Sequence, residues 1–276
     1  MGQKANPNSF QLSSKTNFFS GNTFNTLEYS TLLKEHYSVS SNVTTFFEKN
    51  NCLVKDCFLI MNNEKSFLTV FINFLVLKRT QKPKYFLKSS TKSNNTGLKT
   101  IVQKFFNIFS KFGYKTSKRF VLQNLNKVAL KHQKTFFSDE HIRVKKELNF
   151  FSKEIYFDVG IFLFCLMNTT KNSSLLFAKF IGRFFKMFHR TKKINKFLLF
   201  LSKFVENVAN TRLKGSRIKG LKIQIKGRFK GVPRSKIRVF EKGCIPLQTI
   251  TNKINYSLFH VNTSYGVFGI KVWVFD

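Results

Sequence analysis

The segment 220–231, GLKIQIKGRFKG, alternates between apolar and polar side chains over almost its whole length. Because successive side chains of a strand point to opposite faces, this pattern predicts a strand with one buried face and one row of cations. Those cations repel one another unless an anion lies along them. The residues predicted to be buried are Leu221, Ile223, Ile225 and Phe229.

The net charge of the whole chain also indicates an anionic partner. Lys and Arg number 48 and Asp and Glu only 13 among 276 residues, so the formal net charge is +35. Self-repulsion on this scale opposes compaction, and the usual partners are nucleic acid or an anionic membrane. Hydrophobic residues make up 42% of the chain, enough for a core, and the length suggests one or two domains.

The basic tract from Asn207 to Phe240 contains no Asp or Glu. A merely solvated basic surface normally has acids interspersed with its cations. The tract therefore predicts contact with a phosphate backbone, made by a folded platform rather than a tail. The predicted contacts are Arg212, Lys214, Arg217, Lys219, Lys222, Lys226, Arg228, Lys230, Arg234, Lys236 and Arg238.

The sequence offers little for catalysis or metal binding. Its five His are scattered, and its four Cys form no CxxC pair, so we expect free buried thiols, no metal and no cofactor. Glu154 and Asp158 lie about 13 Å apart if they share a strand, which is too far for a paired acid and base. No phosphate-binding or nucleophile motif occurs, and we expect no enzyme. The cysteines are Cys52, Cys57, Cys165 and Cys244.

Hydrophobic periodicity gives the expected order of elements. Neither end looks like a targeting segment, and the longest apolar run is too short to cross a bilayer. After an extended arm at 1–27, we expect helices at 28–50, 98–111, 117–132, 174–190 and 194–210, and strands at 53–61, 66–77, 154–167, 220–230, 234–240, 245–257 and 265–275.

Four segments, in order, resemble the universal small-subunit ribosomal protein three family. The first is MGQKANPNSFQL at 1–12, and the second is GLKIQIKGRFKG. KGCIPLQTI at 242–250 and INYSLFHVNTSYGVFGIKVWVF at 254–275 complete the series. The resemblance is clear over 1–12 and 196–276 and looser over 29–77 and 154–195.

This resemblance implies an α+β fold in two domains. The first, 28–173, would be a type II KH-like domain, with the strand at 155–165 as its third strand. Its GxxG loop is degenerate, since NNTGLKT keeps only Gly97. A large insertion at about 78–153 matches no part of the family pattern, so we expect it outside the shared core. The second domain, 174–276, would be α+β with a mostly antiparallel sheet.

The resemblance also implies a structural role in the head of the small ribosomal subunit, near the mRNA entry path. Gln3 and Lys4 of the arm would join the rRNA contacts. The family's entry-path cations fall on Leu198, Leu199 and Ser202, so other lysines would have to substitute for them. Those substitutes are Lys192, Lys193, Lys196 and Lys203.

The implied partners are small-subunit rRNA, mRNA, small-subunit ribosomal proteins ten and fourteen, and organelle-specific ribosomal proteins around the insertion. The many Phe, Lys and Asn residues have A- and T-rich codons, which is typical of organelle genomes. The resemblance implies the mitochondrion, since mitochondrially encoded members of the family have a large insertion of this kind. Two alternatives stay open: a basic RNA-binding maturation or splicing factor outside the ribosome, and a peripheral membrane-surface protein.

Overall fold

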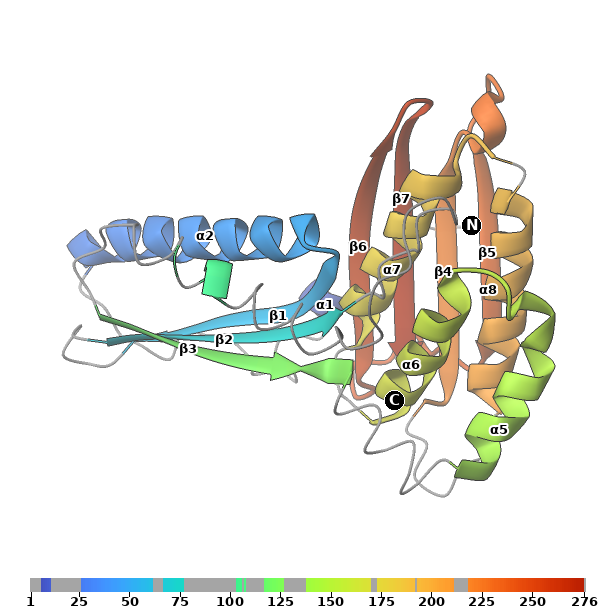
Figure 1. The fold of residues 1–276 in the computed structure, drawn as a ribbon, viewed down its shortest axis with the longest axis horizontal. Helices are drawn as coiled ribbons and strands as arrows, with labels where there is room; N and C mark the ends of the chain where they lie inside the picture. The colour runs from blue at the N-terminus through green and yellow to red at the C-terminus, as the bar shows by residue number, and fades with distance from the viewer. Residues whose placement is uncertain are drawn as a thin grey trace, which may run out of the picture. The chain divides into compact units, whose positions relative to one another are not determined.

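The computed structural model describes residues 6–10, 26–61, 67–76, 103–105, 107, 117–126, 138–169, 173–191, 193–210 and 218–275 (Figure 1). The chain divides into two compact units. The amino-proximal unit is 18–124, and the carboxyl unit combines 1–17 with 125–276.

The amino-proximal unit is a helix on a mixed sheet. It contains α2 (Thr26–Lys49), β1 (Cys52–Met61), β2 (Phe67–Val76) and β3 (Ser117–Asn124). The strand order is β1-β2-β3, with β1 antiparallel and β3 parallel to β2. Phe47 of α2 anchors the core, 5.0 Å from Phe74 and 5.4 Å from Phe105 between ring centroids. The predicted order of helix, strand, strand is confirmed.

The third strand of this sheet corrects two predictions. Residues 117–132 were expected to be helical, but 117–124 form β3, which pairs with β2 from Phe67 opposite Ser117 onward. The segment has weak periodicity of its own, and pairing with β2 decides its state. The third strand is thus β3 and not the segment 155–165.

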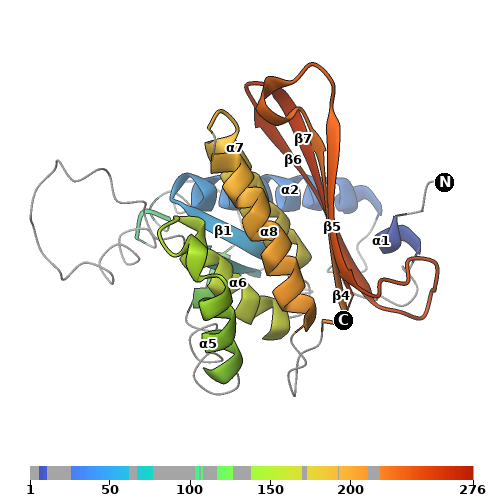
Figure 2. The same cartoon turned by 90° about the vertical axis from the view of Figure 1, so that its right-hand side faces the viewer.

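The carboxyl unit has two layers. Its sheet is antiparallel throughout, in the order β5-β4-β7-β6. In Figure 2 the sheet is seen nearly edge-on, with α7 and α8 on one side and α1 on the other. The elements are α1 (Pro7–Phe10), α5 (Ser138–Glu147), η1 (Asn149–Phe151), α6 (Tyr156–Thr169), α7 (Ser174–Phe188), α8 (Lys193–Asn210), β4 (Gly220–Gly227), η2 (Phe229–Gly231), β5 (Lys236–Gly243), β6 (Ile254–Thr263) and β7 (Gly266–Phe275).

Helix α6 overturns the predicted strand at 154–167. Its residues are apolar on nearly every side, and most of them are buried. An apolar run of this kind has no clear period, so sequence alone does not separate a buried helix from a buried strand. The helix belongs to the carboxyl unit, whose longer segment runs from Leu125 to Asp276, whereas the sequence places 154–167 in the first domain. Leu148 and Phe151, inside the predicted insertion, are also buried in this unit.

Phenylalanine fills the core between the helices of the carboxyl unit. Phe180 and Phe184 of α7 are buried, with ring centroids 5.0 Å apart, and Phe197 of α8 lies 5.6 Å from Phe184. Tyr156 is fully buried among these rings, and burial raises its pKa. Its hydroxyl has no hydrogen-bond partner among the residues that the structure describes. Core packing, predicted as the default role for most phenylalanines, is confirmed for these.

None of the four cysteines, all of which the structure describes, forms a disulfide, and not all of them are buried. Cys52 and Cys165 are buried, and burial raises the pKa of the Cys165 thiol to about 12. Cys57 is half-buried, and Cys244 is exposed because it directly follows the edge strand β5. Within the described ranges, no helix combines the length and the apolar character that crossing a membrane requires.

Candidate nucleic-acid interface

Strand β4 has the two-sided character that its sequence predicts. Leu221, Ile223 and Ile225 are fully buried on the face that α7 and α8 cover. On the other face Lys226 is exposed, and Lys222 and Gln224 are half-buried. The predicted burial of the three aliphatic side chains is confirmed.

Phe229 also turns inward, although it does not lie in the strand. Strand β4 ends at Gly227, and Phe229 belongs to the short helix η2. Its ring is half-buried, 5.3 Å from Phe268 and 6.0 Å from Phe185 between centroids. The core therefore holds the start of the turn that follows β4.

The backbone of η2 is constrained by hydrogen bonds from Arg228 and by the nearby ring of Tyr265, which lies between β6 and β7. The Arg228 guanidinium donates hydrogen bonds to the carbonyl oxygens of Val232 at 3.0 Å and Gly231 at 3.4 Å. Gly231 has φ +74°, and an added Cβ would lie 3.1 Å from the Tyr265 ring. Lys230 has φ +57° and an exposed side chain. The turn thus presents Lys230 and Arg228 on a constrained backbone.

Lys222 differs from the other cations of β4 because its charge has a partner within the protein. Its ammonium lies 2.5 Å from a carboxylate oxygen of Glu241 on β5, and only 23% of the side chain is exposed. It also lies 6.0 Å from the centroid of the Trp273 ring. Glu241 follows the acid-free tract by one residue. A contact between Lys222 and phosphate would therefore have to displace this ion pair.

Strand β5 carries cations on the face opposite to Lys226. Lys236 pairs with Gly227 and Arg238 with Ile225, so both side chains lie on the helix-covered face of the sheet. Both are nevertheless exposed, because β5 is an edge strand. The cations share one face as their alternation predicts, but Ile237 and Val239 on the other face are exposed as well, so β5 lacks the buried face that β4 has. Cations thus lie on both faces of the β4–β5 edge.

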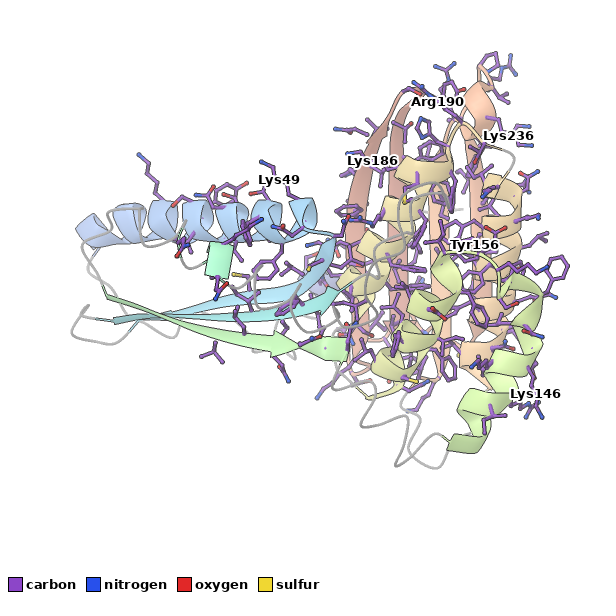
Figure 3. All side chains as sticks on the ribbon, in the orientation of Figure 1. Lys49, Lys146, Tyr156, Lys186, Arg190 and Lys236 are labelled. Atoms are coloured by element: carbon purple, nitrogen blue, oxygen red, sulfur yellow. The ribbon has the colours of Figure 1, made fainter. Side chains whose placement is uncertain are left out.

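Further cations lie at the same end of the carboxyl unit. Figure 3 shows Lys186, in the last turn of α7, and Arg190, just after that helix, at the upper end of the sheet together with Lys236. Arg190 donates from Nε to the Ser264 hydroxyl at 3.1 Å, and a ring nitrogen of His189 lies 2.9 Å from the same oxygen. Sequence reasoning missed Lys186 and Arg190. The available signal was the basic end of the predicted helix 174–190.

The lysines proposed for the mRNA path make contacts inside the unit. Lys193 is exposed at the start of α8. Lys196 lies 4.0 Å from a carboxylate oxygen of Glu154, and the Lys203 ammonium lies 5.8 Å from the Phe151 ring centroid. These two lysines face η1 and the start of α6. They are not part of the basic edge formed by β4 and β5.

Two of the remaining predicted contacts, Lys219 and Arg234, lie within the described residues. The Lys219 ammonium lies 5.3 Å from the Phe275 ring centroid, and the Lys219 backbone N–H donates to the carbonyl of Phe275 at 2.8 Å. Arg234 is exposed in the segment between η2 and β5. No group of His, Cys, Asp and Glu within the described ranges could hold a metal ion. Gln3, Lys4, Lys192, Arg212, Lys214 and Arg217 lie outside the described residues.

Comparison with known proteins bears on the part of the chain that holds this edge. Residues 202–274 match the family described as Ribosomal protein S3, C-terminal domain. Over these residues, the chain is similar to the universal ribosomal protein S3 family. The match begins within α8 and spans all four strands of the carboxyl sheet, including the whole β4–β5 edge.

Individual S3 relatives align over a short stretch. "Small ribosomal subunit protein uS3c" of Marchantia polymorpha is 48% identical over 63 residues, which are 23% of this chain and 29% of the relative. Its counterpart in Zea mays is 47% identical over 62 residues, 22% of this chain and 28% of the relative. The counterpart in Helicosporidium sp. is 50% identical over 56 residues, which are 20% of this chain and 23% of the relative. The chain thus aligns with less than a third of each of these relatives.

Proposed function

We propose that the chain is a structural component of the small ribosomal subunit of an organelle and that the β4–β5 edge binds rRNA. The observation that carries the proposal is the placement of cations within the S3-like residues 202–274. Lys226 is exposed on the face of β4 that lies opposite its buried aliphatic side chains, and Lys230 is exposed in the turn that follows. Lys236 and Arg238 are exposed on the other face of the sheet, at its β5 edge.

A phosphate backbone suits this edge better than a flat anionic surface does. The exposed cations lie on both faces of the sheet, so a strand of RNA that wraps the edge can meet both rows. From Arg183 to Phe275 the sequence has only two carboxylates, Glu206 and Glu241, and Glu241 is paired with Lys222. Little within this segment offsets the field that attracts phosphate. The match of residues 202–274 to ribosomal protein S3 supports a structural and not an enzymatic role.

The finer placement in the subunit rests on the sequence resemblance. In this proposal the amino-proximal unit is a type II KH-like domain, supported by its order α2-β1-β2 and by its mixed sheet. The chain lies in the subunit head near the mRNA entry path, beside small-subunit ribosomal proteins ten and fourteen. Lys193 is then the described lysine best placed to reach mRNA, since Lys196 and Lys203 have partners within the unit.

The identity of the organelle is a further detail of the proposal. The relatives are named uS3c, a name for plastid proteins, and so favour a plastid over the mitochondrion expected from the sequence. Sedimentation of tagged protein from purified plastids and from purified mitochondria would separate the two. Cofractionation with the small subunit of one organelle, and not the other, identifies the location.

The same sedimentation experiment tests the function. We expect the protein to migrate with small subunits on a sucrose gradient. Migration with RNA free of subunits would instead indicate a maturation or splicing factor, and flotation with anionic liposomes a membrane-surface protein. If the edge neutralises roughly six to ten phosphates, affinity for rRNA falls about 10³–10⁵-fold between about 50 and 200 mM salt. A flat salt response would contradict RNA binding.

A further inference from the structure

The carboxyl sheet has a second face, on the side opposite to α7 and α8 (Figure 2). We call it the outer face. Helix α1 contacts it on β6, where the Asn8 side-chain amide donates to the carbonyl oxygen of Tyr256 at 3.2 Å. Away from this contact, side chains of all four strands are exposed on the outer face. They include Lys226 of β4, Val239 of β5, Leu258 and His260 of β6, and Lys271 of β7.

The register of the strands shows that these side chains are neighbours. Gly269 of β7 lies directly opposite Lys226 on one side and His260 on the other. Lys271, two residues further along β7, is on the same face and lies opposite Leu258. Residues directly opposite one another have Cβ atoms about 4.5–5.5 Å apart. The outer face therefore has a bare position at Gly269, with Lys226, His260 and Lys271 around it.

Nothing within the described structure requires a glycine at position 269. Its φ is not in the left-handed region, and an added Cβ would meet no atom within 4 Å. Every other glycine that the structure describes either has a positive φ or would bring an added Cβ within 3 Å of a neighbour. A glycine inside a strand weakens it and often marks a place where a ligand approaches the backbone closely. Gly269 thus indicates a ligand on the outer face.

The charges around Gly269 indicate the chemistry of that ligand. Neither Lys226 nor Lys271 forms an ion pair with a residue that the structure describes. Among the described residues of the outer face the only acid is Glu241, and it is already paired with Lys222. The arm that carries α1 adds none, since residues 1–17 include no Asp or Glu. The ligand is therefore anionic.

A protein partner fits this arrangement poorly. Protein interfaces have few charged residues at their centre and a polar rim. On the outer face this order is reversed, because Lys226 and Lys271 lie on the central strands β4 and β7. The exposed apolar side chains Val239 and Leu258 lie on the outer strands β5 and β6. A second copy of the chain would bring the two sets of lysines into contact, which disfavours self-association.

We propose that a strand of RNA crosses the outer face at Gly269, with its phosphates on Lys226 and Lys271 and a base on the His260 ring. The inference rests on the proposed function and extends it, since the RNA continues from the β4–β5 edge across β7 to β6. The missing side chain at Gly269 lets the RNA approach the backbone of the sheet. An open sheet with cations and a ring for stacking suits a single strand, whose bases are accessible.

The first test measures binding of a dye-labelled single-stranded RNA to the full-length chain by fluorescence anisotropy. The probe has mixed sequence and is about 12 nucleotides long, within the range that one such surface covers. Gly269→Val places a side chain in the path of the RNA and should weaken binding about tenfold or more. Gly269→Ala should weaken it less. Because an added Cβ meets no neighbour and valine suits a strand, the melting temperature should equal or exceed that of the parent chain.

Removal of a cation tests the same face without adding a side chain. Lys271→Ala should reduce the slope of log affinity against log salt by about 1, through loss of one phosphate contact. Lys146→Ala is the matched control, because it removes the same charge from an exposed position on α5, outside the outer face. It should leave the slope unchanged.

Two results would overturn this inference and leave the proposed function standing. They are parent-like RNA binding by Gly269→Val, and equal changes of slope for Lys271→Ala and Lys146→Ala. If the parent chain itself does not bind RNA, both are wrong. A photoreactive benzoylphenylalanine in place of Val267, two residues from Gly269 on the same face, identifies the occupant in organelle extract. Crosslinking to RNA supports the inference, and crosslinking to protein without RNA contradicts it.

Discussion

Strands β4 and β5 are neighbours with similar sequences and very different surroundings. GLKIQIKG and KIRVFEKG both alternate between apolar and charged side chains. In β4, however, Ile223 and Ile225 are fully buried, whereas in β5 Ile237 and Val239 are 52% and 49% exposed. Residues paired across the two strands share a face, and Arg238 lies opposite Ile225.

The difference comes from the position of each strand in the sheet. β4 lies between β5 and β7 beneath the helices, while β5 is at the edge. Alternation along one strand fixes which side chains share a face. It does not fix which face is covered, because that depends on neighbours far away in the sequence. The two strands should therefore respond differently to equivalent substitutions.

The largest expected effect is on stability. Ile223→Ala or Ile225→Ala should lower the free energy of unfolding by about 2–5 kcal/mol, because each leaves a cavity in the packed face. Val239→Ala on β5 should change it by no more than about 0.5 kcal/mol. Urea unfolding followed by circular dichroism measures both. Equal losses for the two strands would show that β5 is covered on its apolar face.

The cations should act on RNA binding and not on folding. Lys226→Ala, Lys236→Ala and Arg238→Ala should each reduce the slope of log affinity against log salt by about 1, through loss of one phosphate contact. Melting temperatures should stay at the parent value. A lower slope for Lys226 alone would confine RNA to one face of the sheet and break the proposal that it wraps the edge.

Lys222 should behave unlike Lys226, although both point to the same face of β4. Since Lys222 pairs with Glu241, Lys222→Ala should leave the salt slope nearly unchanged. It should lower the free energy of unfolding by no more than about 1 kcal/mol. A double-mutant cycle with Glu241→Ala measures the pair directly. A drop of a full unit in the slope would mean that RNA displaces Glu241.

A small effect on stability, of opposite sign at two positions, is expected in and before the turn after β4. Lys230 has φ +57°, a conformation that costs an L-residue about 1–2 kcal/mol and glycine little. Lys230→Gly should therefore leave stability unchanged or raise it by less than about 1 kcal/mol. Lys226→Gly, in the strand itself, should lower it by about 0.5–1 kcal/mol. Thermal unfolding of the two variants compares them, and a clear loss for Lys230→Gly would argue against this turn geometry.

The sequence predicts elements well where hydrophobic periodicity is local. The alternating segment 220–230 becomes β4 and η2, and the basic helices at 174–190 and 194–210 become α7 and α8 within a few residues. Prediction from the sequence fails where packing or pairing with distant segments decides the secondary structure. Helix α6 is buried on nearly all sides and has no period, and β3 depends on pairing with β2.

Some features of the candidate site can likewise be predicted from the sequence, and others cannot. The cations of β4 and β5 follow from the charge of the tract, and their alternation follows from strand geometry. The ion pair between Lys222 and Glu241 cannot be predicted from the sequence pattern, because it requires the register of the two strands. Nor can the presence of Lys186 and Arg190 at the same end, since they come from α7 and the residues just after it. Such groupings depend on tertiary packing, which no local pattern encodes.

The edge position of β5 also matters before any RNA is bound. A free edge exposes backbone N–H and C=O groups that can pair with the same edge of a second molecule, and Ile237 and Val239 would favour such pairing. Lys236, Arg238 and Lys242 on the same strand oppose it, because a second copy of β5 would bring like charges into contact. These charges thus oppose aggregation of the newly made chain, and they are the same charges that the proposed function assigns to RNA binding.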